Sequence, residues 1–105
     1  MRIVNRRARF KYAVIEKVEA GMILTGAEIK SIRAGRADLS EGFARIRDGE
    51  IFLANAFIAP WMGSTSDSQA RRERKLLLHR KQILNWQGKM AGGKFTLVPI
   101  AIYIR

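Results

Sequence analysis

The stretch FARIRDGEIFLANAFIAP, from Phe43 to Pro60, decides the fold. Asp48 and Gly49 suit the two central positions of a tight hairpin turn, and the residues on both sides are typical of strands. Such a turn joins neighbouring antiparallel strands, and Pro60 would end the second of them. The sequence therefore predicts a hairpin from Phe43 to Pro60 at the centre of a mainly β protein.

Three further segments have the composition of strands. FKYAVIE (Phe10–Glu16) alternates as a strand requires, and Met22–Leu24 is a short apolar run. The run FTLVPIAIYIR (Phe95–Arg105) is interrupted or edged by Pro99. Its last residues, Ile100–Arg105, lack a predicted partner strand, and a bare apolar edge invites aggregation. We therefore expect the chain to be a piece of a longer protein, whose next strand would cover this edge.

Two helices are expected between the strands. The sequence TGAE has the T-x-x-E spacing of a capping box, in which the Thr25 hydroxyl accepts from the Glu28 amide. This helix would end near Gly35, because glycine readily adopts the left-handed conformation that follows a helix. The second helix is expected over Gln82–Lys89, ending at Gly88.

The order of these elements indicates the fold class. A polar loop is expected between Trp61 and Gln69, but no repeat or linker divides the chain. Strands and helices do not alternate as a parallel sheet would require. We therefore predict one domain, residues 1–105, built as a small antiparallel β-barrel with two or three peripheral helices.

The net charge is the strongest indication of function. It is +11, from 20 Lys and Arg residues against 9 Asp and Glu residues. Residues 1–15 carry five basic residues and no acid, and residues 71–105 carry nine basic residues and one acid. If folding brings the two basic ends together, they form one positive surface for a polyanion, most commonly a nucleic acid. The alternatives are a role in solubility alone or a loose affinity for acidic lipids.

The composition argues against several other classes of protein. Cysteine is absent, and His79 is the single histidine, so disulfides, thiolate metal sites and nucleophilic pairs are not expected. We predict no enzyme activity, no catalytic residue and no metal or other cofactor. The start MRIVNRRAR lacks the apolar core of a signal peptide, and no run reaches the length of a membrane span. These features predict a cytoplasmic protein without a membrane or small-molecule partner.

The stretch RRERKLLLHR (Arg71–Arg80) joins a basic segment to a leucine run and allows two interpretations. As a helix, it leaves one leucine among basic side chains. As a strand over Arg74–Leu78, it points Leu76 and Leu77 to opposite sides, with a helix starting after His79. In either case one leucine lies on a basic surface, where it could pack beside an unstacked RNA base. The alternative is that all three leucines belong to the core.

Ordered motifs cover nearly the whole chain from Asn5 onward. They are NRRAR (Asn5–Arg9), EAGMILTGAEIKSIRAGRADL (Glu19–Leu39), FARIRDGEIFL (Phe43–Leu53), RKLLLHR (Arg74–Arg80) and FTLVPIAIY (Phe95–Tyr103). Together they resemble the small protein B family, which binds bacterial transfer-messenger RNA (SsrA RNA) in ribosome rescue. The string EAG…L-x-G-x-E-x-K-S-x-R-A-G is long and ordered, so coincidence is a poor explanation.

The resemblance implies an oligonucleotide-binding-fold-like barrel that binds the tRNA-like domain of transfer-messenger RNA and helps to deliver it to stalled ribosomes. Such an adaptor of trans-translation performs no covalent chemistry. We expect a monomer, with the small ribosomal subunit as a second partner. The chain departs from the family pattern at Phe10, where a histidine or another polar residue is usual, and at Ser68-Gln69, where Asp-Pro is common. The family continues past Arg105 with a strand and a basic tail, which we expect this chain to lack.

The predicted RNA-binding residues come from the resemblance and from the basic segments. Asn5, Glu19 and Leu77 match RNA-contact positions of the family. The basic residues that we expect to contact RNA are Arg6, Arg7, Arg9, Lys30, Arg33, Arg74, Lys75 and Arg80. The alternatives are a solvated N-terminal arm, a turn-capping role for Glu19 and ordinary exposed charges on the first predicted helix. Folding should gather the arm and Arg74–Arg80 on one wall of the barrel.

Two other functions remain open at this point. A generic ribosomal or single-strand RNA-binding barrel would fit the charge and the strand pattern without the motifs. A metal-dependent nuclease would need acidic residues such as Asp38, Glu41 and Asp48 to gather around a metal ion.

Overall fold

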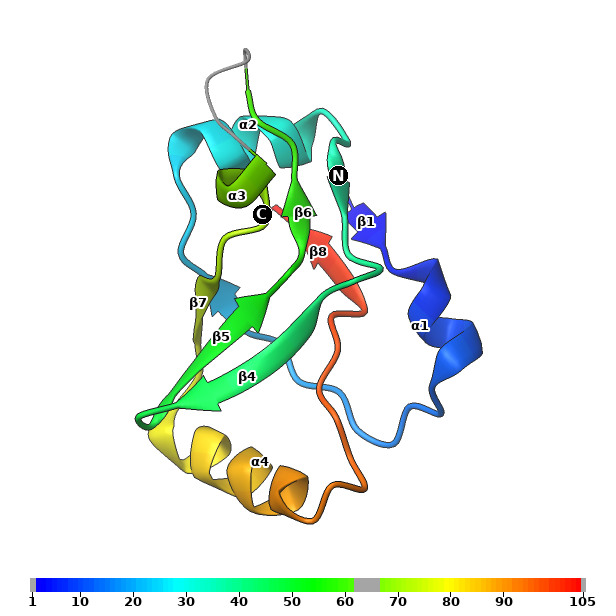
Figure 1. Ribbon diagram of the computed structural model, residues 1–105, viewed down its shortest axis with the longest axis vertical. Coiled ribbons are helices and arrows are strands. Elements are labelled where there is room, and N and C mark those ends of the chain that lie inside the picture. Colours follow the sequence, from blue (N-terminus) through cyan, green and yellow to red (C-terminus); the bar gives the residue numbers. More distant parts are fainter. Residues whose placement is uncertain (1, 62–66, 105) are drawn as a thin grey trace.

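A computed structural model describes residues 2–61 and 67–104, which form short strands and four helices (Figure 1). In chain order the elements are β1 (Arg2–Val4), α1 (Arg6–Lys11), β2 (Gly21–Met22), α2 (Gly26–Arg33), β3 (Ala37–Asp38), β4 (Phe43–Arg47), β5 (Glu50–Ala54), β6 (Phe57–Ile58), α3 (Asp67–Ala70), β7 (Arg74–Leu77), α4 (Arg80–Ala91) and β8 (Ala101–Tyr103).

The strands pair in three antiparallel sheets. The largest has the order β2-β7-β5-β4, and the pairs β1-β8 and β3-β6 form two small sheets. Helices α2 and α3 lie at one end of the long axis and α4 lies at the other (Figure 1). The prediction of a mainly antiparallel β protein with a few helices is confirmed. The strand pairs of the described residues do not form a closed barrel.

The predicted hairpin is present. Asp48 and Gly49 both have positive φ, 53° and 77°, as the central residues of this turn type require, and Arg47 pairs with Glu50 across it. The second strand ends at Ala54 and not at Pro60, because Asn55 also takes a positive φ and turns the chain toward β6. The hairpin therefore contributes β4 and β5 to the main sheet.

The core lies on one face of this sheet. Alternation along β5 turns Ile51 and Leu53 inward, and Leu76 of β7 points to the same side. The central cluster consists of Leu39, Leu53 and Ala56, with Met22, Leu76 and Ile102 packed against it. Four strands and the turn before β4 thus meet at one apolar centre.

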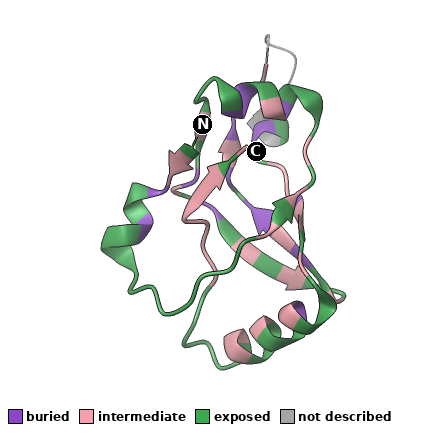
Figure 2. Cartoon of the chain, turned by 180° about the vertical axis from the view of Figure 1, so that it is seen from behind, coloured by how far each residue is buried: buried purple, intermediate pink, exposed green. Residues whose placement is uncertain are grey.

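The N-terminal region differs from the prediction. The strand expected over Phe10–Glu16 is wrong: residues 6–11 form α1, residues 12–20 are neither helix nor strand, and Phe10 is 92% exposed. Figure 2 shows this exposed segment crossing one face of the molecule toward β2. The helix forms because the Asn5 side chain accepts from the Ala8 amide and caps its first turn. The next strand, β2, begins at Gly21 and not at Met22.

The predicted capped helix is confirmed as α2. The Thr25 hydroxyl accepts from the Glu28 amide at 3.1 Å, and the Glu28 carboxylate accepts from the Thr25 amide at 2.9 Å. Gly35 follows this helix with a φ of 75°. The other predicted helix, α4, begins at Arg80 and passes Gly88, ending at Ala91 before Gly93, which has a φ of 74°.

The C-terminal segment also differs from the prediction. Ile100–Arg105 was expected to lack a partner strand, but β8 pairs with β1, which the sequence did not indicate, with Ile3 opposite Ile102. The middle of the polar loop predicted between Trp61 and Gln69 lies outside the described residues, and its end forms α3. The two ends of the described chain are therefore joined in one small sheet.

Candidate nucleic-acid interface

Asn5 was expected to offer its amide to RNA, but the structure gives that amide other partners. The residue is 4% exposed. Its Nδ2 donates to the carbonyls of Leu39 and Pro99 at 3.2 Å and 2.8 Å, and its Oδ1 accepts from the Ala8 amide at 3.2 Å. In this structure the Asn5 side chain therefore has protein partners for its amide, and a direct RNA contact at Asn5 stays a prediction. Asn5 fastens α1 to the turn before β4 and to the segment before β8.

Arg74 is the second predicted contact that proves to be buried. Its side chain is 0% exposed, and all five guanidinium N–H groups donate to protein oxygens. Nε donates to the Glu28 carboxylate at 2.7 Å, and the other four reach the backbone carbonyls of Ala56, Gln69, Ala70 and Arg72. Arg74 is thus part of the protein interior, where its N–H groups have protein partners, and its contact with RNA stays a prediction.

Glu28 is the acidic partner at this buried position. Burial alone would raise the pKa of its carboxyl, but hydrogen bonds from Arg72, the Thr25 amide and Arg74 outweigh it and lower the pKa from 4.5 to about 2. Arg72 Nη2 lies 2.5 Å from Glu28 Oε1. We call Glu28, Arg72 and Arg74 the arginine node. It ties α2 to β7.

Leu77 is the leucine of the RKLLL run that is most exposed to solvent. Leu76 packs on the core, whereas Leu77 is 51% exposed at the end of β7, so the strand interpretation of RKLL is confirmed. Gly21 pairs with Leu77, and a Cβ on Gly21 would lie 3.4 Å from the Leu77 side chain. Strand β2 therefore runs beside Leu77 and leaves part of its side chain in solvent. The neighbouring Lys75 forms an exposed ion pair with Glu50 at 2.8 Å.

Glu19 lies two residues before this pairing, in the exposed segment that leads into β2. Its carboxylate accepts a hydrogen bond from the Tyr103 hydroxyl of β8. The glutamate is therefore exposed but held, and it lies in the chain segment that enters β2 next to Leu77.

The remaining predicted cations are exposed and spread over the molecule. Arg6, Arg7 and Arg9 lie on α1, Lys30 and Arg33 on α2, and Arg80 at the start of α4. The two helices α2 and α4 are at opposite ends of the long axis (Figure 1). The first turn of α4 contains basic Arg80 and no acid, which the helix dipole disfavours. A bound phosphate near this turn would offset that repulsion.

The two basic segments, which were predicted to gather on one wall, lie far apart across the molecule. Helix α1 lies at one lateral edge of the molecule and β7 at the other (Figure 1), and residues 12–20 cross the face between them (Figure 2). Any surface that uses both segments must therefore extend across this whole face. We call it the broad face: α1, residues 12–20, β2 and the Leu77 end of β7.

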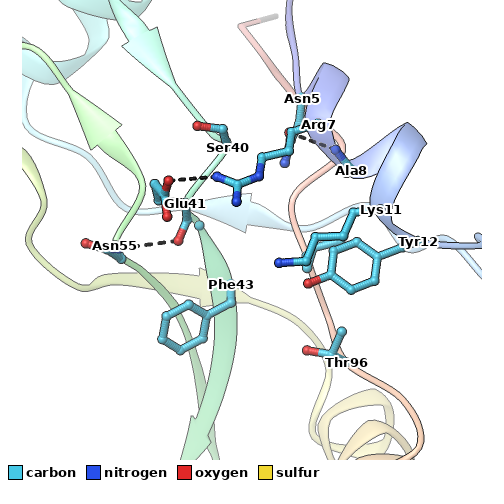
Figure 3. Close-up of a pocket in the computed structure, with 12 residues that line it drawn as sticks. Asn5, Arg7, Ala8, Lys11, Tyr12, Ser40, Glu41, Phe43, Asn55 and Thr96 are labelled. Carbon is cyan, nitrogen blue, oxygen red and sulfur yellow. Dashed lines mark hydrogen bonds and ion pairs between the residues drawn. The ribbon is translucent and has the colours of Figure 1, made fainter.

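One pocket adjoins this surface. It has a volume of about 390 Å³ and lies between α1, the turn before β4 and the segment before β8 (Figure 3). Lys11, Tyr12 and Phe43 line it, and none of them was predicted as a site residue. Recognition of Asn5 as a helix cap would have placed Arg7 and Lys11 one turn apart on one side of α1.

The acidic residues of the nuclease alternative have other partners. Asp38 accepts from the Ser40 amide, Glu41 pairs with Arg7, and Asp48 is in the hairpin turn. Within the described ranges, no group of three or more His, Asp or Glu side chains is placed to hold a metal ion.

No helix in the described part of the chain is long and apolar enough to cross a membrane.

Comparisons with known proteins give one consistent result. The family model for SmpB protein matches residues 2–105. An SsrA-binding protein of Streptococcus pneumoniae strain CGSP14 is 46% identical over 102 residues, which cover 96% of this chain and 66% of that protein. The SsrA-binding protein of S. pneumoniae serotype 4, strain ATCC BAA-334 / TIGR4, gives the same values.

A solved structure described as "tmRNA-SmpB: a journey to the center of the bacterial ribosome" contains a similar chain. Its TM-score is 0.81 at 46% sequence identity, over 99% of this chain and 73% of that chain. The chain thus spans slightly less than two thirds of the length of the S. pneumoniae relatives.

Proposed function

This chain belongs to the SmpB protein family, and on that basis we propose that it is an RNA-binding adaptor of trans-translation. It binds the tRNA-like domain of transfer-messenger RNA and helps to deliver that RNA to stalled ribosomes. The transfer-messenger RNA and the small ribosomal subunit are its partners, and it performs no covalent chemistry. The names of the similar proteins, which refer to SsrA binding and to the ribosome, support this proposal.

The observation that carries the proposal is the exposure of Leu77. A half-exposed leucine leaves apolar surface in contact with water, which is unfavourable. A nucleic-acid base that packs on Leu77 can cover that surface. Glu19 lies in the segment that leads to the strand beside it, where a carboxylate can accept from base amino groups. We therefore propose Leu77 and Glu19 as the centre of the RNA contact, with Lys75 and Arg80 nearby.

The exposed cations extend the proposed RNA-binding surface beyond Leu77 and Glu19. We propose that Arg6, Arg7 and Arg9 contact phosphates at one edge of the broad face and Arg80 at the other. Lys30 and Arg33 lie on α2, and they are proposed as phosphate contacts for an RNA that extends to that end of the molecule. Phosphate contacts of this kind fix orientation and raise affinity without reading sequence.

We also propose that the three sheets act together as a partly open, oligonucleotide-binding-fold-like barrel in a single domain. Two backbone bonds support this arrangement. The Ala44 amide of β4 donates to the Leu97 carbonyl at 2.9 Å, and the Asn5 amide after β1 donates to the Ile100 carbonyl at 2.7 Å. The segment before β8 thus bridges the edge of the main sheet and the β1-β8 pair. A monomer in the bacterial cytoplasm, where ribosomes work, is part of the same proposal.

A gel-shift comparison tests the proposed function. The probes are an intact tRNA-like RNA domain and the same domain with its loops mutated, each with the wild type and with Leu77→Ala. We expect the wild type to prefer the intact domain at least tenfold and the variant to lose most of that preference. Leu84→Ala is a matched control, because Leu84 is 53% exposed on α4 and is not one of the proposed contact residues. Equal affinity of the wild type for both RNAs would contradict the proposal.

The generic single-strand RNA-binding barrel remains the second candidate. It is favoured by the exposed aromatic and aliphatic side chains along residues 10–18, which could stack on bases without sequence preference. An unstructured RNA of equal length separates the two candidates. Tighter binding of that RNA than of the tRNA-like domain, with no effect of Leu77→Ala, would favour the generic barrel.

A further inference from the structure

We propose that the pocket between α1 and β4 holds one unstacked nucleotide of the bound RNA. This inference rests on the proposed function, since the nucleotide belongs to the RNA that the broad face binds. It adds Lys11, Tyr12 and Phe43 to the binding surface and assigns Arg7 to the pocket.

The size and position of the pocket fit one nucleotide. Its volume of about 390 Å³ falls in the lower part of the range of small-molecule sites, roughly 300 to 1,000 Å³. Its walls come from α1, from the turn before β4 and from the segment around Thr96 (Figure 3). The pocket thus shares α1 and Tyr12 with the broad face, so an RNA that passes around α1 can reach both.

Two aromatic rings provide surfaces for a base. Figure 3 shows Tyr12 and Phe43 on opposite sides of the pocket. Phe43 is about one third exposed, as is Tyr12, so each ring keeps open area. The guanidinium of Arg45 lies 5.3 Å from the Phe43 ring centroid and restrains the ring from outside the pocket. Bases of RNA stack on such rings when they leave their own helix.

The cations are placed for a phosphate. Arg7 and Lys11 are four residues apart, on the same side of α1, and Figure 3 shows the Lys11 ammonium pointing into the pocket. Within the described part of the chain Lys11 has no ion pair, and its ammonium lies 5.6 Å from the Tyr12 ring centroid. Arg7 pairs with Glu41 at 2.8 Å, but both side chains are about half exposed. An exposed pair of this kind is weak, so a phosphate can displace it.

Acceptor groups on the opposite wall can read the base edge. Glu41 uses one carboxylate oxygen for Arg7, and the Asn55 amide donates to the Glu41 carbonyl at 3.4 Å. When a phosphate draws Arg7 away, the Glu41 carboxylate is left to accept from a base that carries an amino group. Adenine, guanine and cytosine have such a group and uracil does not. The pocket should therefore prefer a base other than uracil.

Affinity measurements with the full chain and a tRNA-like RNA domain test the pocket. We expect Phe43→Leu and Lys11→Ala each to weaken binding about tenfold, which is within the effect of losing one base–aromatic stack or one phosphate contact. Phe43→Tyr keeps the ring and should bind as the wild type does. Phe95→Leu is the matched control, since Phe95 is an exposed aromatic residue beside Thr96 that does not line the pocket. Thermal unfolding of each variant shows whether it is folded.

Two direct readouts complete the test. Ultraviolet cross-linking of the complex, followed by mass spectrometry, should place an RNA adduct on Tyr12 or Phe43. Nuclear magnetic resonance titration of the free protein with 5′-AMP should move the signals of Lys11, Tyr12 and Phe43, and 5′-UMP should move them less.

The outcomes separate this inference from the proposed function. If Leu77→Ala weakens binding while folded Phe43→Leu and Lys11→Ala bind as the wild type, the pocket is overturned and the function stands. If the wild type does not prefer the tRNA-like RNA, but 5′-AMP binds saturably at Tyr12 and Phe43, the function fails and a nucleotide pocket remains. If the protein binds neither the tRNA-like RNA nor 5′-AMP, both the proposed function and the pocket are overturned.

Discussion

The arginine node and α1 use arginine in opposite ways. In the node, Arg74 is completely buried and donates all its N–H groups to protein oxygens. On α1, Arg6 and Arg9 are exposed and Arg7 makes one exposed ion pair. Each of these arginines adds one positive charge to the net charge of +11, but of the two regions only α1 offers its cations to a polyanion. The difference shows that a count of basic residues overstates the charge available to RNA.

The contrast has a simple physical origin. A guanidinium can leave water only where a carboxylate and enough carbonyls replace its solvation, because an unpaired buried charge is very costly. Glu28, the last residue of α3 and Ala56 just before β6 supply those oxygens around Arg74. Among the residues that the structure describes, no such set of oxygens surrounds the arginines of α1. The node therefore stabilises the junction of α2, α3 and β7, and α1 remains available for binding.

The largest expected effect comes from breaking the node. Glu28→Gln leaves the buried Arg74 without its counter-charge, and removal of one partner of a buried pair typically lowers the free energy of unfolding by about 3 to 5 kcal/mol. Glu41→Gln is the matched control, because it breaks the exposed pair with Arg7, worth about 0 to 1 kcal/mol. Urea denaturation followed by circular dichroism measures both. Similar losses for the two variants would mean that the node is no stronger than a surface pair.

Acid should weaken the node without any mutation. The pKa of Glu28 is about 2 in the folded protein and has its ordinary value of 4.5 in the unfolded chain. The unfolded chain therefore binds more protons between these pH values, and the free energy of unfolding falls as the pH drops from 4.5 toward 2. The full contribution is present above pH 4.5. The stability difference between wild type and Glu28→Gln should shrink over this window, and a constant difference would contradict the assignment.

A smaller effect is expected where α1 is anchored. Asn5→Ala removes a helix cap, worth about 1 kcal/mol, and leaves the Leu39 and Pro99 carbonyls without a donor, so we expect a total loss of about 2 to 3 kcal/mol. Asn5→Asp keeps the cap acceptor but not the amide donor, and it places a carboxylate against two carbonyls. If urea denaturation shows Asn5→Asp to be as stable as wild type, the two carbonyl bonds contribute nothing.

The same comparison explains which features could be predicted from the sequence. The Asp48-Gly49 turn and the Thr25–Glu28 capping box are decided within four residues, and both were predicted correctly. The role of Asn5 depends on carbonyls 34 and 94 residues away. The alternation in FKYAVIE suggested a strand, but Phe10 and Lys11 end α1 and residues 12–16 are neither helix nor strand. The burial of Arg74 likewise needs oxygens from several separate segments, and its local sequence, RRERK, resembles an exposed basic run.

The candidate surface was partly predictable for the same reason. The side on which Leu77 lies follows from the strand period, which the sequence shows directly. The pocket does not follow from any local pattern, because its walls combine α1, the turn before β4 and residues near Thr96. The distance between α1 and β7 is a property of the whole sheet. Motifs can thus name surface residues, but folding decides how far apart they lie.

The smallest effect on stability, and the sharpest test of the comparison, concerns the exposed arginines of α1. Arg6→Ala and Arg9→Ala should each change the free energy of unfolding by less than about 0.5 kcal/mol, because neither side chain is buried. If each contacts one phosphate, the slope of log affinity for the tRNA-like RNA against log salt should become less negative by about 0.9 per variant. Arg36→Ala, an exposed arginine just after α2, serves as a control for general charge. If Arg36→Ala changes the slope by the same amount, loss of a distant charge weakens binding as much as loss of a proposed contact. The arginines of α1 would then contribute only to the electrostatic field of the whole protein.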